Sequence, residues 1–135
     1  MREIRFRIWN KNGKRMLYDS GLPIKGNKVI EEIGFKVMQF TGLQDKNGQK
    51  IYEGDIVYDE TIKAKSEIVF GLFEGVSNEY GYYKCLGFHR KWSDNSGYSI
   101  LSGENDLEII GNIYKNPRLL HKPVKKQGEN KTTKK

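Results

Sequence analysis

Four carboxylates fall close enough together in this sequence to suggest metal chemistry. Glu53, Asp55, Asp59 and Glu60 lie within eight residues, and a nuclease can hold Mg²⁺ with such a group. Glu53 and Asp55, however, flank a glycine where acidic residues serve a turn, and the other two begin a polar connection, DETIKAKS. We therefore interpret all four as structural and predict no metal site, with a metal-dependent nuclease as an alternative.

Cys85 and His89 are the only cysteine and histidine that are close in the sequence. On a straight strand they share a face but lie about 13 Å apart, at about 3.3 Å per residue, which is too far for a nucleophile and its base. Cys85 is interpreted as a core residue. Neither G-x-x-x-x-G-K-[ST] nor G-x-G-x-x-G occurs, so nucleotide-dependent chemistry has no support. We predict no catalytic residue and no cofactor.

The segment YGYYKCLGFHRKW, residues 80–92, interleaves aromatic and basic side chains. Bases stack on aromatic rings and phosphates pair with cations, so this segment is the candidate binding surface. An amphipathic strand with an aromatic core face and a charged solvent face has the same pattern. The candidate binding residues are Tyr82, Tyr83, His89, Arg90, Lys91 and Trp92.

The elements that would position these residues are short strands. In REIRFRIW, Ile4, Phe6 and Ile8 alternate with Arg5 and Arg7, which predicts a strand with the isoleucines and Phe6 facing the core and the arginines facing water. With Arg2, the arginines form a charged comb of the kind found on edge strands. A turn with positive φ at Asn12 and Gly13 then predicts a hairpin that returns through residues 14–18.

The segment FTGLQDKNGQKIYEGDIV, residues 40–57, predicts a second hairpin of the same type, because DKNGQKI resembles NKNGKRM. Asp45, Asn47 and Gly48 supply its turn. Gly54 permits a bend, and Asp55 accepts hydrogen bonds from nearby backbone N–H groups, so that DIVY starts in a new direction.

Further strands are expected in SEIVFGLF, YGYYKCLGFHRKW and LEIIGNIY, with a loop around a short apolar piece at residues 93–106. A short helix or 3₁₀ turn is possible at NPRLL and another in KVIEEIG. Several short strands without alternating helices predict a mostly β fold, a small antiparallel barrel or curled sheet.

The chain has 135 residues and a net charge of +7. Residues 121–135 contain six lysines and one glutamate, which is +5 of that charge. We predict one β-rich domain over residues 1–120 and a disordered basic tail over residues 121–135, either a solubilising terminus or a polyanion-binding arm. No secretory or membrane-spanning stretch is evident, so a cytoplasmic protein is expected.

Three segments together, MREIRFRIWNKNGKRM, MQFTGLQDKNGQKIYEGDIV and IIGNIYKNPRLL, resemble the YopX family of small bacteriophage and prophage proteins. The resemblance covers about residues 1–120 and implies a β-rich, oligomer-prone domain in a bacterial host, with no assigned site. The leading hypothesis is a non-enzymatic accessory protein that binds a host or phage protein, a nucleic acid or a nucleotide, and forms a homo-oligomer. The alternative is nucleic-acid binding through residues 82–92 and the lysine tail.

Overall fold

The computed structural model describes residues 3–18, 24–25, 28–29, 34–77, 81–101 and 106–120, and gives only the backbone of residues 24–25, 28–29 and 77. The predicted basic tail, residues 121–135, lies outside the described residues, as does Arg2. Of the helix considered in KVIEEIG, the first two residues form a strand and residues 30–33 are also outside that range. No described helix is long and apolar enough to cross a membrane.

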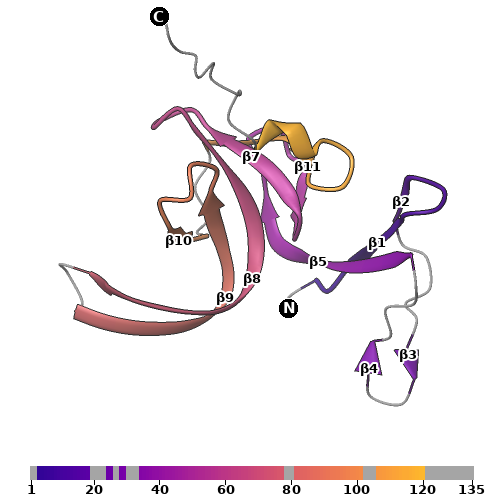
Figure 1. Ribbon diagram of the computed structural model, residues 1–135, viewed down its shortest axis with the longest axis horizontal. Coiled ribbons are helices and arrows are strands. Elements are labelled where there is room, and N and C mark those ends of the chain that lie inside the picture. The colour runs from indigo at the N-terminus through magenta and orange to yellow at the C-terminus, as the bar shows by residue number, and fades with distance from the viewer. Residues whose placement is uncertain are drawn as a thin grey trace, which may run out of the picture.

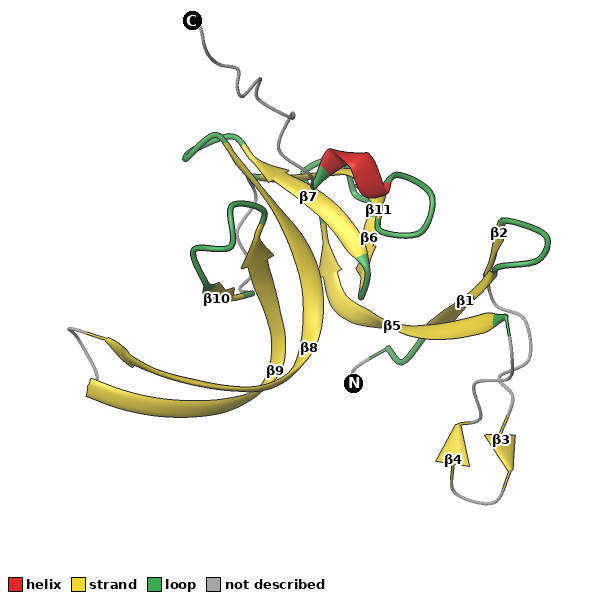
Figure 2. Ribbon diagram, viewed as in Figure 1, coloured by secondary structure: helices red, strands yellow, loops and turns green. Residues whose placement is uncertain are grey.

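Two antiparallel sheets make up most of the described chain (Figures 1 and 2). The first sheet has the strand order β2-β1-β5-β6 and is formed by β1 (Phe6–Asn10), β2 (Arg15–Tyr18), β5 (Phe35–Gln44) and β6 (Lys50–Tyr52). The second has the order β10-β9-β8-β7-β11 and is formed by β7 (Asp55–Asp59), β8 (Ala64–Ser77), β9 (Gly81–Trp92), β10 (Tyr98–Ile100) and β11 (Leu107–Asn112). A small hairpin pairs β3 (Ile24–Lys25) with β4 (Lys28–Val29), and η1 (Pro117–Leu119) is a 3₁₀ turn.

The second sheet curls into a half-barrel (Figure 1). The predicted mostly β fold with a curled antiparallel sheet is therefore confirmed, as is the 3₁₀ turn in NPRLL. The loop expected at residues 93–106 contains the short strand β10, which pairs with β9.

The β1–β2 hairpin forms as predicted, but its turn chemistry differs. Asn10 Oδ1 accepts hydrogen bonds from the N–H groups of Asn12 and Gly13. The residue with positive φ is Lys14, at 53°, and neither Asn12 nor Gly13 adopts that conformation. The side chain of Asn10, two positions before Asn12, thus accepts the hydrogen bonds that shape the turn.

The β5–β6 hairpin has the turn that the sequence predicts. Gly48 has a φ of 81°, and Asp45 Oδ1 accepts hydrogen bonds from the N–H groups of Asn47 and Gln49, both at 2.9 Å. The second carboxylate oxygen of Asp45 accepts from Ile109 N–H at 3.0 Å. Asp45 is only 6% exposed, so one buried side chain closes the turn and ties it to β11.

The predicted bend at Gly54 carries the chain from the first sheet into the second. Gly54 has a φ of 89°, which L-residues rarely adopt. Its N–H donates to Ile68 O, and its carbonyl accepts from Ile113 N–H. A Cβ at this position would lie 2.8 Å from Met38 Sδ. Gly54 therefore meets both the conformational and the spatial demand of the bend.

The core lies around residues that both sheets contribute. Ile51 of β6 packs with Val57, Ile68 and Leu107 of the second sheet, and all four are at most 1% exposed. Leu43, Phe88, Leu101 and Ile109 are partly buried against this cluster. Burying each of the four central side chains contributes about 1.5–3 kcal/mol.

The arginine comb predicted on an edge strand is wrong for Arg7. β1 is an inner strand, paired with β2 on one side and β5 on the other. Arg7 is 3% exposed, whereas Ile4, assigned to the core, is 61% exposed. Apolar and charged residues do alternate along β1, but both faces of the strand are covered. The alternation therefore does not distinguish core side chains from solvent-facing ones.

Candidate binding surfaces

The four carboxylates of the first motif point to different partners and do not converge on one site. Glu53 Oε1 accepts from Gln39 N–H at 3.2 Å, and Glu60 lies 3.0 Å from Lys46 Nζ. Asp55 and Asp59 pair with arginines. Within the described ranges no three Asp, Glu, His or Cys side chains are grouped as metal ligands.

Asp55 and Arg7 form a buried ion pair that joins the two sheets. Arg7 Nη2 lies 2.8 Å from Asp55 Oδ1, and each side chain is 3% exposed. Tyr52 N–H donates to Asp55 Oδ2 at 2.8 Å, and Arg7 Nη2 also donates to Glu53 O at 3.1 Å. The first of these bonds is the predicted role of Asp55 at the bend. Burial raises the pKa of the Asp55 carboxyl, while the charge of Arg7 and the Tyr52 N–H oppose that rise.

Asp59 and Arg90 form a second buried pair, inside the curled sheet. Arg90 Nη1 donates to Asp59 Oδ2 at 2.9 Å, and both side chains are 7% exposed. The Arg90 guanidinium lies 4.9 Å from the ring centroid of Trp92, whose Nε1–H donates to Ser99 Oγ. This group holds β7, β9 and β10 together.

The structure divides the six candidate binding residues between the two faces of β9. Tyr82, Arg90 and Trp92 lie on one face, while Tyr83, His89 and Lys91 lie on the other, because successive strand residues alternate. His89 and Arg90 are 1% and 6% exposed, so neither presents its polar group to a partner. Tyr82 is 64% exposed at the far end of the strand. The six residues therefore do not form one exposed surface.

His89 and Cys85 are spaced along the same face of β9, as expected. His89 Nδ1 lies 3.1 Å from Gly87 O, and its ring contacts Phe73, with the centroids 4.1 Å apart. Phe73 in turn contacts Tyr98, at 4.5 Å between centroids. Cys85 is partly buried opposite Phe73. These contacts are those of a packed aromatic cluster.

A surface that the sequence analysis missed as a whole is the outer half of the β8–β9 hairpin, of which only the β9 strand lies in the predicted segment 80–92. Residues 70–77 and 81–88, here called the arm, extend away from the rest of the described chain (Figure 1). On one side, here called the arm face, four cross-strand pairs follow one another. They are Phe70 with Phe88, Leu72 with Leu86, Glu74 with Lys84, and Val76 with Tyr82.

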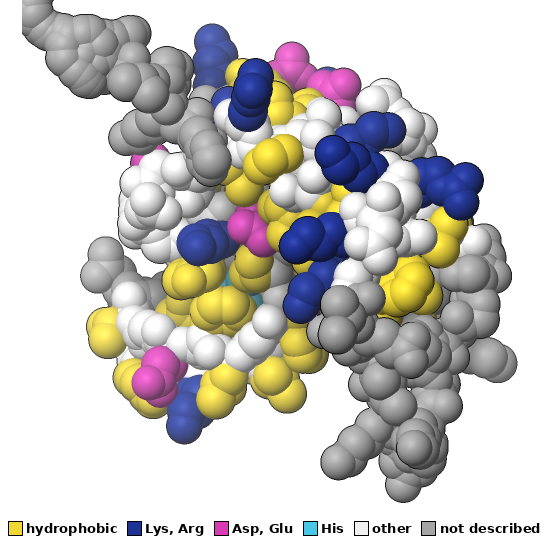
Figure 3. Space-filling view, turned by 45° about the vertical axis from the view of Figure 1, so that its right-hand side comes forward, with side chains coloured by type: hydrophobic (Ala, Val, Ile, Leu, Met, Phe, Trp, Pro, Cys, Tyr) yellow, Lys and Arg dark blue, Asp and Glu magenta, His cyan; other side chains and the backbone are white. Residues whose placement is uncertain are grey.

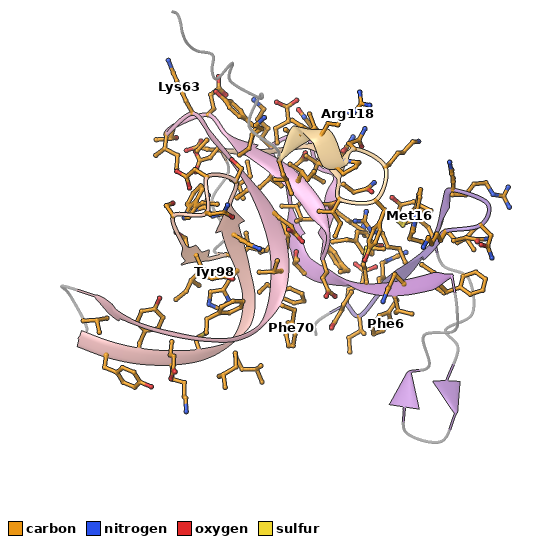
Figure 4. The ribbon with its side chains drawn as sticks, in the orientation of Figure 1. Phe6, Met16, Lys63, Phe70, Tyr98 and Arg118 are labelled. Carbon is orange, nitrogen blue, oxygen red and sulfur yellow. The ribbon has the colours of Figure 1, made fainter. Side chains whose placement is uncertain are left out.

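The arm face is apolar and open to solvent. Its side chains at 47–81% exposure are Phe70, Leu72, Val76, Tyr82 and Leu86. At the base of the arm Phe70 and Phe88 contact each other, with centroids 5.0 Å apart, and Phe88 packs on the core. Figure 4 shows Phe70 and Tyr98 on opposite sides of the curved ribbon. The arm face is thus an uncovered continuation of the core face of the sheet.

A second missed surface is a cleft of about 1060 Å³ between the first sheet and the loop after β11. Its lining includes Trp9, Phe35 and Tyr114, and the charged residues among the described part of the lining are Lys11, Lys14, Lys36 and Lys115. The lysines come from three separate segments, so no continuous stretch of the sequence indicates the cleft. Figure 3 shows lysine and arginine side chains next to apolar ones on this side of the molecule.

The described sheets define a mostly β protein built on a curled half-barrel. The chain belongs to the YopX family: the family model described as YopX protein matches residues 5–121. Among curated proteins none matches the sequence. The fold is similar to that in the crystal structure of protein EF1440 from Enterococcus faecalis, with a TM-score of 0.53 and 24% sequence identity, covering 90% of this chain and 100% of that chain.

Proposed function

We propose that the protein is a non-enzymatic binding protein that assembles with a second copy of itself through the arm face. The exposed apolar side chains of that face are the observation that carries the proposal. Contiguous apolar patches on a protein surface mark interaction sites, and covering this one would extend the core face of the sheet. The remaining partner, a host or phage macromolecule, would be bound by the assembled form.

The charges of the arm face favour a second copy as its occupant. Glu74 and Lys84 lie opposite each other in the middle of the face, with apolar pairs on both sides. A twofold axis parallel to the arm would place Glu74 opposite the partner's Lys84 and Leu72 opposite the partner's Leu86. A closed dimer needs a self-complementary surface of this kind, because the same patch serves both subunits.

The non-enzymatic role and the bacterial setting have separate support. Each carboxylate that suggested metal chemistry has a partner within the described fold: Glu53, Asp55 and Asp59 in buried or partly buried contacts and Glu60 in an exposed ion pair. YopX family membership supports a phage or prophage origin, which would place the protein in the cytoplasm of a bacterial host.

Replacing Leu86 with lysine tests the proposed assembly. We expect the natural chain to sediment at about twice its mass of 15.7 kDa at micromolar concentration. Leu86→Lys should weaken self-association at least about tenfold, because it places a charge in the centre of an apolar contact. Sedimentation equilibrium measures both.

Ile62→Lys is the matched control. Ile62 is 55% exposed in the turn between β7 and β8, outside the arm, so its replacement should leave self-association unchanged. A natural chain that sediments at the single-chain mass, or two variants that associate equally well, would refute assembly through the arm face. Circular dichroism of both variants checks that the sheets are retained.

A further inference from the structure

We propose that the lysine-lined cleft binds a nucleotide unit, a planar base together with its phosphate. The cleft lies between the β1–β2 turn, the start of β5 and the loop that follows β11. It is remote from the arm face, so this inference does not depend on the proposed assembly. Two properties of its lining select the ligand: the sign of its charges and the position of its aromatic rings.

The charged side chains that the described residues contribute to the cleft are all lysines. Lys11 and Lys14 stand on the β1–β2 turn, Lys36 on β5 and Lys115 on the far wall, and all four side chains are exposed. Within the described ranges no aspartate or glutamate lines the cleft. The sequence up to residue 120 carries a net charge of only +2, so four lysines along one cleft are a local concentration of positive charge. Such a cleft attracts an anion and retains it over competing neutral molecules.

The aromatic side chains give the cleft a place for a flat apolar group. Trp9 and Tyr114 are stacked, with ring centroids 5.8 Å apart and an angle of 16° between the rings. Trp9 is 7% exposed and stacks against Tyr114, while Tyr114 and Phe35 are half-buried. Ring faces beside cations are the arrangement that single-strand binding proteins use for a base and its phosphate.

Both outer walls of the cleft are held rigid by asparagine side chains. Asn10 accepts from two backbone N–H groups of the β1–β2 turn. Asn112 Oδ1 accepts from the N–H groups of Tyr114 and Lys115, at 3.0 and 2.8 Å. The start of β5 is joined to the β1–β2 turn, because Lys11 N–H donates to Gly34 O at 2.7 Å. A preformed site loses less conformational entropy on binding than one that must be ordered by its ligand.

The test measures binding of two probes to the full chain, ATP and a ten-residue oligothymidylate, at about 50 mM salt, where phosphate contacts are strong. The double variant Lys11→Gln/Lys115→Gln should weaken binding at least about tenfold and lower the slope of log affinity against log salt by about 0.7 per lysine. Phe35→Leu should weaken binding about fivefold or more, because it keeps the apolar volume and removes the ring.

The matched control is Lys46→Gln/Lys63→Gln, which removes the same charge from exposed lysines outside both the cleft and the arm face. It should bind like the natural chain. Amide shifts in ¹⁵N–¹H spectra should concentrate at residues 9–14, 34–36 and 113–117. Binding of ATP as tight as that of the oligonucleotide assigns the cleft to a free nucleotide, and preference for the oligonucleotide assigns it to a strand.

Three results would overturn the proposal. The first is absence of binding to either probe at the permissive salt concentration. The second is equal weakening by the cleft variant and the control variant, which would mean that net charge alone is responsible. The third is a pair of results: a decaglutamate peptide displaces the oligonucleotide as effectively as ATP does, and Phe35→Leu has no effect on binding. The cleft would then recognise negative charge alone and not a base.

Discussion

Asp55→Asn is expected to lower the free energy of unfolding by about 3–5 kcal/mol. The substitution keeps the shape of the side chain, and its amide oxygen still accepts from Tyr52 N–H. It removes the negative charge beside Arg7, whose side chain is 3% exposed. The variant is destabilised because the buried Arg7 guanidinium then lacks a counter-charge. Urea unfolding followed by circular dichroism measures the change in the free energy of unfolding.

The double variant Arg7→Met/Asp55→Asn separates this cause from simple loss of a contact. It should be more stable than Asp55→Asn alone, because it no longer buries an uncompensated charge. Glu60→Gln breaks an exposed pair with Lys46 and should change stability little. If Asp55→Asn costs no more than Glu60→Gln, the buried pair does not join the sheets as described.

Asp45→Ala is expected to lower the free energy of unfolding by about 3 kcal/mol or more. Its buried carboxylate accepts from the N–H groups of Asn47, Gln49 and Ile109, and alanine leaves all three without that acceptor. Two of these groups belong to the β5–β6 turn and the third to β11, so the variant should loosen both elements. Thermal unfolding and amide hydrogen exchange at residues 47–49 and 109 measure the effect.

Asp94→Ala is the matched control for Asp45. Asp94 Oδ1 accepts from Ser96 N–H in an exposed turn between β9 and β10. Water can replace that acceptor, so its loss should be much smaller. Equal losses for the two variants would show that burial of Asp45 between the sheets contributes nothing.

Turn chemistry made part of this fold predictable from the sequence. Gly48 and Gly54 adopt the positive φ that their positions in the sequence suggested, and Asp55 bonds to the backbone beside its bend. These features depend on residues only a few positions apart. The burial of Arg7 was not predictable in this way, because its counter-charge arrives from a distant segment when the two sheets pack.

The binding surfaces were harder to predict for two different physical reasons. The cleft is assembled from the β1–β2 turn, β5 and the loop after β11, so its lysines are scattered in the sequence. Both faces of the arm carry apolar side chains, for example Leu72 on one face and Phe73 on the other. Such a strand is read as buried on both faces, and only the packing reveals which face lacks a cover.

A charge exchange across the arm face tests the proposed assembly most directly. Glu74→Lys and Lys84→Glu should each weaken self-association, because each homodimer would bring like charges together. An equimolar mixture of the two variants should associate again as a heterodimer, which native mass spectrometry resolves after isotope labelling of one chain. Homodimers of both variants as stable as the natural one, or a mixture that stays monomeric, would contradict assembly through this face.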